Sequence, residues 1–346
     1  MFLNLLLISC AVLSTVSAHS VPLRKRVVAQ FINTQYAGTV GADKGNYLLV
    51  FDSGSPYILL ASQECLGGAC DCASTQKYVG QGNPNAKSIT VTYFDTESAT
   101  GKPTNASVTI ANLTSPHQGI ILVDEIGYAL CTLTASGVVG LAPPTAATQP
   151  GFETVVDSFA TEGLIANVFS VHHARYPDGE HFGELVLGGV NSKFVVGDFT
   201  SAKLQEPDSW KIKLDQVLIG DKNVADDNTL GFVDTSKAII LGPKAQVDEI
   251  NEEIGCTPTT IGSTEYCELD CSQTSQLPEF TFVISGTNFN ISAEYYIQRN
   301  GDLCYSGFMP SSLGYYMIGD FFIDHYYTVY NWEKKEMQFA IAREDA

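Results

Sequence analysis

Two stretches of the 346-residue sequence decide its fold: Phe51-Asp52-Ser53-Gly54-Ser55-Pro56-Tyr57-Ile58-Leu59-Leu60 and Val233-Asp234-Thr235-Ser236-Lys237-Ala238-Ile239-Ile240-Leu241-Gly242. Each places one aspartate after an apolar strand and follows the aspartate with a second apolar run. Each half of the chain also has a later apolar-apolar-Gly element, Val138-Val139-Gly140 in the first and Met317-Ile318-Gly319 in the second. This internal repeat predicts two similar lobes, each of which delivers one carboxylate to a shared cleft.

Short segments rich in β-branched and aromatic residues recur between Gly, Asn, Asp and Pro, for example at 47–51, 88–93 and 279–284. This pattern is typical of a mostly-β protein. Helices are expected at 152–163 and 244–254, where apolar residues return every three or four positions and a glycine marks the end. The predicted class is therefore all-β, with two lobes and a few short helices.

The first 18 residues carry no charge, are apolar through Leu13 and end in Val16-Ser17-Ala18, which is typical of a secretory signal peptide. No later segment approaches the roughly 18 apolar residues that a membrane-spanning helix needs. The remaining length exceeds what one core usually organises. We therefore expect a secreted, extracellular protein with a signal peptide at 1–18, an N-terminal lobe at 19–195 and a C-terminal lobe at 196–346.

The formal net charge of −19 argues against some classes of partner. Nucleic acids and anionic membranes are bound largely through Lys and Arg, which are outnumbered here by Asp and Glu, 19 to 38. We therefore expect neither nucleic acid nor a membrane as a partner. A solvated acidic surface is the simplest interpretation of the charge.

Eight cysteines follow the predicted signal, an even number in a chain bound for an oxidising compartment, so four disulfides are expected. The eight are Cys65, Cys70, Cys72, Cys131, Cys256, Cys267, Cys271 and Cys304. They allow 105 connectivities, although the first two are close enough in sequence to close a tight loop. Three sequons, at Asn105, Asn112 and Asn290, are candidate glycosylation sites.

The segment Asp52-Ser53-Gly54-Ser55 resembles the Asp-Thr/Ser-Gly-Ser/Thr catalytic loop of the pepsin-like aspartic proteases. Further matches to that family follow in the family's order, at 136–142, 183–189, 234–235 with 241–243, 277–279 and 318–322. The resemblance covers nearly the whole predicted mature chain and implies the bilobal pepsin-like fold, with a peptide or other small ligand in the interlobe cleft. It also suggests disulfides Cys65–Cys70 and Cys271–Cys304, with Cys72–Cys131 and Cys256–Cys267 as guesses.

The chemistry of that family needs two carboxylates so close that they cannot both ionise, so that one holds a proton while the other activates a water. Asp52 and Asp234 supply the pair, and no cofactor is needed for catalysis. In the family, the hydroxyls that Ser53 and Thr235 retain cross-link the two loops at the floor of the cleft. The resemblance thus implies an intact scaffold for the dyad.

The second loop departs from the family pattern at two positions. Ser236 replaces a glycine that leaves room for the opposite loop, so its side chain could occupy the place of the attacking water or hydrogen-bond an aspartate. Lys237 replaces a hydroxyl residue, and its charge near Asp234 would lower the pKa of that carboxyl. The alternative is that Lys237 points outward and has little effect.

Two further departures concern access to the cleft. The hairpin that closes over substrate in the family keeps its tyrosine as Tyr93, but both glycines are lost and Phe94 stands at the tip, where it either restricts the cleft or faces outward. The segment between Ala18 and Asp52 leaves no room for the long basic prosegment of such enzymes. The short basic run at 24–26 is expected to be a solvated terminus or a processing site.

These features together resemble one branch of the family, the cockroach aspartic-protease-like allergens, which are regarded as weak or inactive proteases. That branch is thought to bind zinc, and the resemblance implies His173, His181, Asp320 and Asp324 as ligands in a closed, structural site. His173 and His181 lie in one segment, and the two strands expected to flank it, at 168–173 and 182–187, should form a hairpin. Ordinary surface histidines are the alternative.

The expected function is therefore that of a secreted pepsin-fold protein with weak or no proteolytic activity, which binds an unknown ligand. The alternative is an active acid endopeptidase that uses Asp52 and Asp234 to activate water, which the intact first-loop glycine favours. An inhibitor or lectin-like decoy on the same fold is a third possibility.

Overall fold

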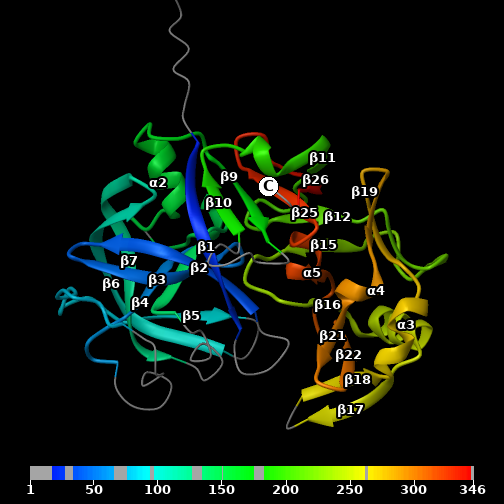
Figure 1. Ribbon diagram of the computed structural model, residues 1–346. Helices are drawn as coiled ribbons and strands as arrows, with labels where there is room; N and C mark the ends of the chain where they lie inside the picture. Colours follow the sequence, from blue (N-terminus) through cyan, green and yellow to red (C-terminus); the bar gives the residue numbers. More distant parts are fainter. Residues whose placement is uncertain are drawn as a thin grey trace, which may run out of the picture.

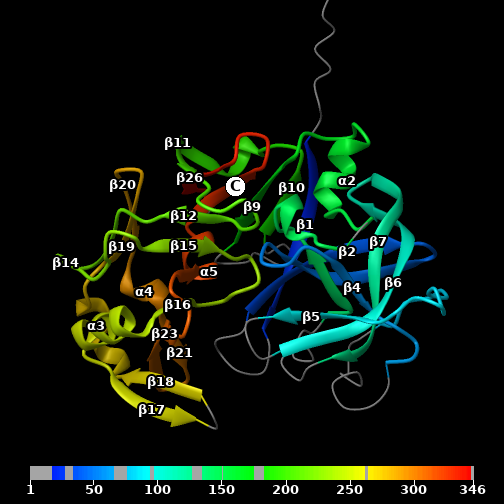
Figure 2. The same cartoon turned by 180° about the vertical axis from the view of Figure 1, so that it is seen from behind.

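The computed structural model describes residues 18–27, 34–65, 76–93, 97–126, 135–149, 151–174, 183–261 and 264–343. Strands dominate these residues and the helices are few and short, which confirms the predicted all-β class. Figures 1 and 2 show two lobes with a group of strands between them at the top. Across the described part of the chain, no helix combines the length and apolar character needed to cross a membrane.

The largest sheet holds the first lobe and the strands between the lobes, in the order β11-β26-β25-β9-β10-β1-β2-β3-β8-β4-β7-β6-β5. Its strands are β1 (His19–Val27), β2 (Thr34–Ala42), β3 (Gly45–Asp52), β4 (Ile58–Ala61), β5 (Ile89–Tyr93), β6 (Glu97–Ile110), β7 (Leu113–Ile126), β8 (Gly137–Gly140), β9 (Val168–His173), β10 (Gly183–Leu187), β11 (Val195–Lys203), β25 (Tyr326–Asn331) and β26 (Glu336–Ala342).

The second lobe contains smaller sheets, in the orders β12-β15-β24-β16-β23, β14-β13-β19-β20 and β17-β18-β22-β21. Their strands are β12 (Lys211–Lys213), β13 (Gln216–Ile219), β14 (Lys222–Asn223), β15 (Leu230–Val233), β16 (Ile240–Pro243), β17 (Thr257–Ile261), β18 (Thr264–Leu269), β19 (Phe280–Ile284), β20 (Thr287–Ile291), β21 (Ile297–Asn300), β22 (Leu303–Ser306), β23 (Phe308–Ser311) and β24 (Tyr316–Ile318). The strands expected at 47–51, 88–93 and 279–284 are confirmed as β3, β5 and β19.

The α-helices are α2 (Val155–Thr161), α3 (Lys244–Ile254), α4 (Ala293–Tyr296) and α5 (Asp320–Ile323), and the 3₁₀ turns are η2 (Pro144–Ala146), η3 (Ser192–Phe194) and η4 (Cys271–Gln276). The two helices expected from sequence are α2 and α3. Helix α3 is followed by Gly255, which adopts φ 75° and whose N–H donates to the Asn251 and Glu252 carbonyls. Glycine accepts this left-handed conformation without steric cost, which explains the helix stop.

The internal repeat of the sequence is a repeat of strand pairing. In the first lobe β8 lies between β3, which is parallel to it, and β4, which is antiparallel, and β4 is parallel to β7. In the second lobe β24 lies in the same way between β15 and β16, and β16 is parallel to β23. Each aspartate therefore stands at the end of a strand that pairs in parallel with the later apolar-apolar-Gly element.

The strands between the lobes bring distant parts of the chain together. The predicted hairpin of β9 and β10 is present, with Leu185 opposite Val171. Strand β10 also pairs with β1, and β9 pairs with β25, which follows α5.

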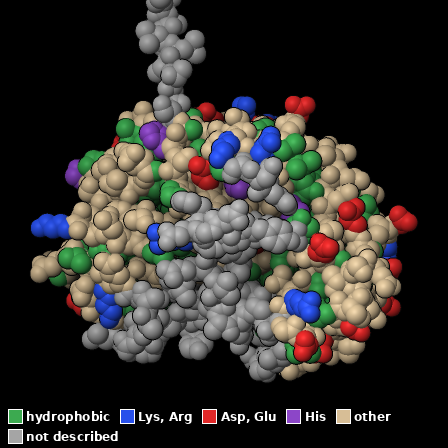
Figure 3. Space-filling view, viewed as in Figure 1, with side chains coloured by type: hydrophobic (Ala, Val, Ile, Leu, Met, Phe, Trp, Pro, Cys, Tyr) green, Lys and Arg blue, Asp and Glu red, His purple; other side chains and the backbone are tan. Residues whose placement is uncertain are grey.

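On the face shown in Figure 3, Lys and Arg side chains of the described residues stand apart and form no broad basic patch.

Candidate functional site

The first aspartate loop begins where β3 ends. Asp52 is buried, and the Gly54 N–H donates to its Oδ1 at 2.8 Å. The main chain of the loop is held by the two residues that follow β8, because the Leu141 N–H donates to the Asp52 carbonyl at 2.7 Å and the Ala142 N–H to the Ser55 carbonyl at 3.0 Å. These bonds fix the carboxylate against the protein interior.

The second loop repeats this arrangement with one addition. Asp234 is fully buried, its N–H donates to the Ile318 carbonyl at 2.9 Å, and the Ser236 N–H donates to its Oδ1 at 2.8 Å. The Ser236 hydroxyl also donates to that same oxygen at 2.8 Å. Of the two outcomes expected for this side chain, the hydrogen bond to an aspartate is the one observed. Asp234 Oδ2 has no hydrogen-bond partner among the described residues.

Two hydroxyls cross-link the loops in a reciprocal way. The Ser53 N–H donates to Thr235 Oγ1 at 3.0 Å, and the Thr235 N–H donates to Ser53 Oγ at 3.1 Å. Each hydroxyl then donates across the interface, Thr235 to the Phe51 carbonyl at 2.7 Å and Ser53 to the Val233 carbonyl at 3.0 Å. The cross-link expected from the resemblance is therefore present and buried.

The two carboxylates are neighbours. A Cβ placed on Gly54 would lie 3.1 Å from an oxygen of Asp52 and 3.1 Å from an oxygen of Asp234. Burial, together with the charge of Asp52, raises the pKa of Asp234 to about 7. Lys237 and the Ser236 hydrogen bonds lower this pKa, but they do not outweigh the two raising causes. The raised pKa favours a proton on Asp234 at acid pH. The charge of Lys237 acts in the predicted direction, but burial and the charge of Asp52 outweigh it.

The predicted flap is only partly described. Tyr93 is the last residue of β5, and its side chain and Phe94 lie outside the described residues.

All three sequon asparagines are exposed, and the side-chain oxygen of Asn290 accepts a hydrogen bond from Thr281 at 3.1 Å. Glycosylation at these positions stays a prediction.

Two of the suggested disulfides are present, Cys256–Cys267 and Cys271–Cys304. Both lie in the second lobe, where the first joins the residue before β17 to β18 and the second joins η4 to β22. Cys65 is also disulfide-bonded. Cys70, Cys72 and Cys131 lie outside the described residues, so their pairings stay predictions.

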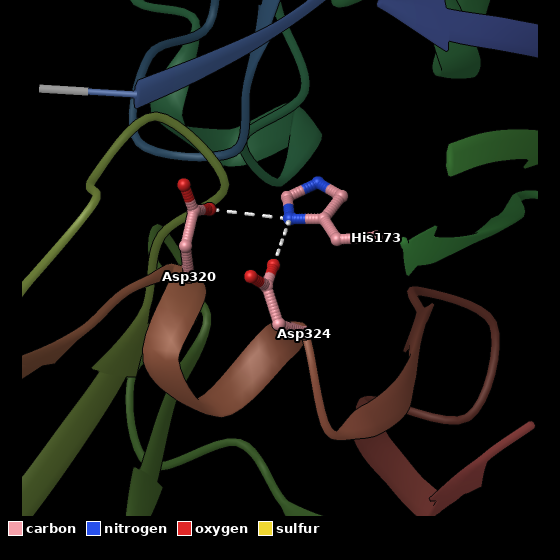
Figure 4. A group of neighbouring side chains, drawn as sticks. All are labelled: His173, Asp320 and Asp324. Carbon is pink, nitrogen blue, oxygen red and sulfur yellow. Dashed lines mark ion pairs between the residues drawn. The ribbon is translucent and has the colours of Figure 1, made fainter. Parts of the chain in front are cut away.

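Three of the four candidate metal ligands meet between the lobes. His173 ends β9, whereas Asp320 and Asp324 stand at the two ends of α5 and point toward the imidazole (Figure 4). His173 Nδ1 lies 3.1 Å from Asp320 Oδ1 and 3.6 Å from Asp324 Oδ1. His181 lies outside the described residues.

The geometry of this cluster fits a small divalent ion. Ligand atoms of tetrahedral zinc, at about 2.0 to 2.1 Å from the metal, lie about 3.3 Å from one another, close to the two distances above. All three side chains are buried, and His173 Nδ1 makes no well-aligned hydrogen bond. Burial lowers the pKa of His173, but the neighbouring carboxylates outweigh burial and raise it. One imidazole and two carboxylates form a set of donors that suits zinc.

Tyr36 of β2 belongs to this cluster and is not predicted from the sequence. Its ring stacks on the His173 imidazole, with centroids 3.5 Å apart, and its hydroxyl donates to Asp324 Oδ1 at 3.0 Å. It therefore orients two of the three candidate ligands. No local motif marks this tyrosine, because its partners are 137 and 288 positions away along the chain.

Both aspartate loops and α5 lie within one region of the chain that is similar to known proteins. The family profile described as eukaryotic aspartyl protease matches residues 35–342. The aspartic protease Bla g 2 of Blattella germanica is 51% identical over 328 residues, covering 92% of this chain and 92% of that protein. Cathepsin D of Clupea harengus is 30% identical over 332 residues, covering 90% and 82%. The resemblance expected from the motifs is confirmed.

Proposed function

Since the chain belongs to the eukaryotic aspartyl protease family, we propose that it is a secreted, peptide-binding protein of the pepsin fold with weak or no proteolytic activity. Proteases of this kind bind peptides in the cleft between their lobes. The cross-linked loops of Ser53 and Thr235 support such a cleft here, because they hold both lobes together at its floor. Three features support secretion: the apolar segment at 1–18, the sequons and the disulfides.

The observation that carries the proposal is the Ser236 hydroxyl. It donates to Asp234 Oδ1 and so competes for a carboxylate oxygen that would otherwise be available to the attacking water. In the first loop the matching residue is Gly54, and a Cβ there would crowd both carboxylates at 3.1 Å. Ser236 carries the Cβ that Gly54 lacks, which leaves less room for a water held between the two aspartates.

One observation favours the second candidate, an active acid endopeptidase. Asp234 has a raised pKa of about 7 and lies beside Asp52, so the pair can hold one proton at acid pH, as the chemistry of two coupled carboxylates requires. In that reaction the ionised carboxylate takes a proton from water as the water oxygen attacks the peptide carbonyl carbon, and the protonated carboxyl gives its proton to the carbonyl oxygen. The proton taken from water then passes to the amide nitrogen as the C–N bond breaks. One hydroxyl of the diol returns a proton to the other aspartate, which leaves a carboxylic acid and an amine.

Hydrolysis of an unfolded protein at about pH 4 separates the two candidates. The proposal expects slow cleavage, at most slightly faster than that by the Asp52→Ala variant, together with binding of a statine-containing peptide in calorimetry. Rapid cleavage that is lost in Asp52→Ala and blocked by the statine peptide would establish the endopeptidase instead. Failure of the peptide to bind would show that the cleft is not a peptide site.

We also propose that the cluster between the lobes holds a structural zinc ion. His173, Asp320 and Asp324 would hold it, and the charges and spacing described above support this set. His181 is the proposed fourth ligand. A metal here would tie β9 to α5 and neutralise two buried carboxylates. Metal analysis of the purified protein should find about one zinc per chain, and Asp324→Asn should abolish it without loss of the fold.

A further inference from the structure

The backbone that carries two candidate metal ligands also supports the Asp234 loop. The Asp234 N–H donates to the Ile318 carbonyl at 2.9 Å, and the Asp320 N–H donates to the Lys237 carbonyl at 2.8 Å. Between these bonds, a Cβ on Gly319 would overlap the Lys237 carbonyl oxygen, so the two segments are in direct contact. Asp320 therefore contacts the loop with its main chain while its side chain points into the metal cluster (Figure 4).

The first half of the chain contains a similar hydrogen bond without a metal ligand, although its donor is the second residue after Gly140, whereas Asp320 directly follows Gly319. Ser55 and Lys237 are each the third residue after their aspartate, and the Ser55 carbonyl accepts from the Ala142 N–H at 3.0 Å. Ala142 carries only a methyl group. Among the described residues, the residue that donates this bond is also a candidate metal ligand only in the second half, where it is Asp320. The Asp52 loop is thus an internal control for any effect of the metal.

We propose that metal binding at His173, Asp320 and Asp324 is coupled to the Asp234 loop through the Asp320–Lys237 backbone bond. Occupied, the site orders this loop and strengthens peptide binding beside Asp234. The inference rests on the proposed zinc site and, for its second part, on the proposed peptide cleft.

The coupling has a simple physical basis. Helix α5 is one turn long and carries one carboxylate at each end. When both carboxylates and the β9 imidazole hold one ion, α5 loses its freedom to move relative to β9. The loop bonded to Asp320 is then ordered before a peptide arrives, so the peptide loses less conformational entropy on binding. By reciprocity, the peptide raises zinc affinity by the same factor.

Hydrogen exchange with and without zinc tests the first part, and it needs no peptide ligand. Zinc binding to the metal-free protein is first measured by calorimetry. We then expect amides of 234–242 to exchange at least about fivefold more slowly with zinc, while amides of 52–60 change less than about twofold. In the Asp324→Asn variant, which keeps the Asp320 backbone bond, zinc should change neither segment.

The outcomes are distinct. Equal slowing of both loops would mean that zinc stabilises the whole fold, and it would overturn the coupling while leaving the zinc site intact. No zinc binding would overturn both. For the second part, the Kd of a statine-containing peptide should fall at least about fivefold with zinc, and an unchanged Kd would overturn that part. A peptide that binds in neither state would overturn the cleft proposal and that part together.

Discussion

The two aspartate loops have the same backbone plan and different surroundings. Asp52 ends β3 and Asp234 directly follows β15, each strand lies next to a parallel partner, and each aspartate accepts an N–H on its Oδ1 at 2.8 Å. The first loop then has Gly54 and is supported by the methyl-bearing Ala142, whereas the second has the hydroxyl of Ser236 and is supported by Asp320.

A symmetric backbone thus carries asymmetric chemistry in this molecule. The hydrogen bonds that build the dyad come mainly from the main chain and from the hydroxyls of Ser53 and Thr235, and they are matched in the two halves. The changes lie in side chains added to that frame. The side chains of the second loop can therefore differ, and the loop can contact the proposed metal site, without loss of the fold.

The largest expected effect concerns the proton on Asp234. Its folded pKa is raised from 3.8 to about 7, so this group contributes stability that is present below its unfolded pKa and lost as pH rises through 7. Wild type should lose up to about 4 kcal/mol between pH 4 and 8 relative to Asp234→Asn, which stays neutral. Urea unfolding across pH measures this.

Asp52→Asn serves as the matched variant, because it removes the second cause of the raised pKa and should make the pH dependence shallower. Parallel stability curves for wild type and Asp234→Asn would show that the second aspartate does not hold the proton.

The cross-link between the loops should have the next largest effect. Thr235→Val removes an acceptor for the Ser53 N–H and a donor to the Phe51 carbonyl, and it leaves both buried groups unpaired. The expected loss in the free energy of unfolding is about 3 kcal/mol. Ser53→Ala should cost a similar amount if the two halves share the cross-link equally. The double variant should cost less than the sum, because the residues form one network. A loss below about 0.5 kcal/mol would contradict the structure.

Restoring the family pattern in the second loop should clearly increase activity. The corresponding change in activation free energy is smaller than the changes in unfolding free energy given above. Ser236→Gly with Lys237→Thr removes the competing hydroxyl and should raise kcat/KM at acid pH by about 10- to 100-fold. The converse change, Gly54→Ser, should lower any residual activity, since its Cβ crowds both carboxylates. If restoration brings no gain, the proposed weak activity has another cause, with Phe94 of the flap as the next candidate.

The sequence alone predicted the features that depend on local pattern. The repeated aspartate motif gave the paired lobes, and the apolar periodicity before Gly255 gave α3 with its observed bounds. It could not say that the Ser236 hydroxyl would bond Asp234 rather than project into the cleft, because a rotamer depends on surrounding atoms. Nor could it find Tyr36, or the bond between Asp320 and Lys237. Both depend on segments that meet only in the folded chain.

The smallest predicted effect separates the two substitutions in the second loop. The charge of Lys237 lowers the pKa of Asp234 more than the Ser236 hydroxyl does. Lys237→Met should therefore raise this pKa by a fraction of a unit to about one unit, within about 1.4 kcal/mol, and Ser236→Ala should raise it less. Carboxyl titration by NMR would measure both shifts. A larger shift in Ser236→Ala would mean that the hydroxyl, and not the charge, controls the proton. The two loops would then differ through one hydrogen bond alone.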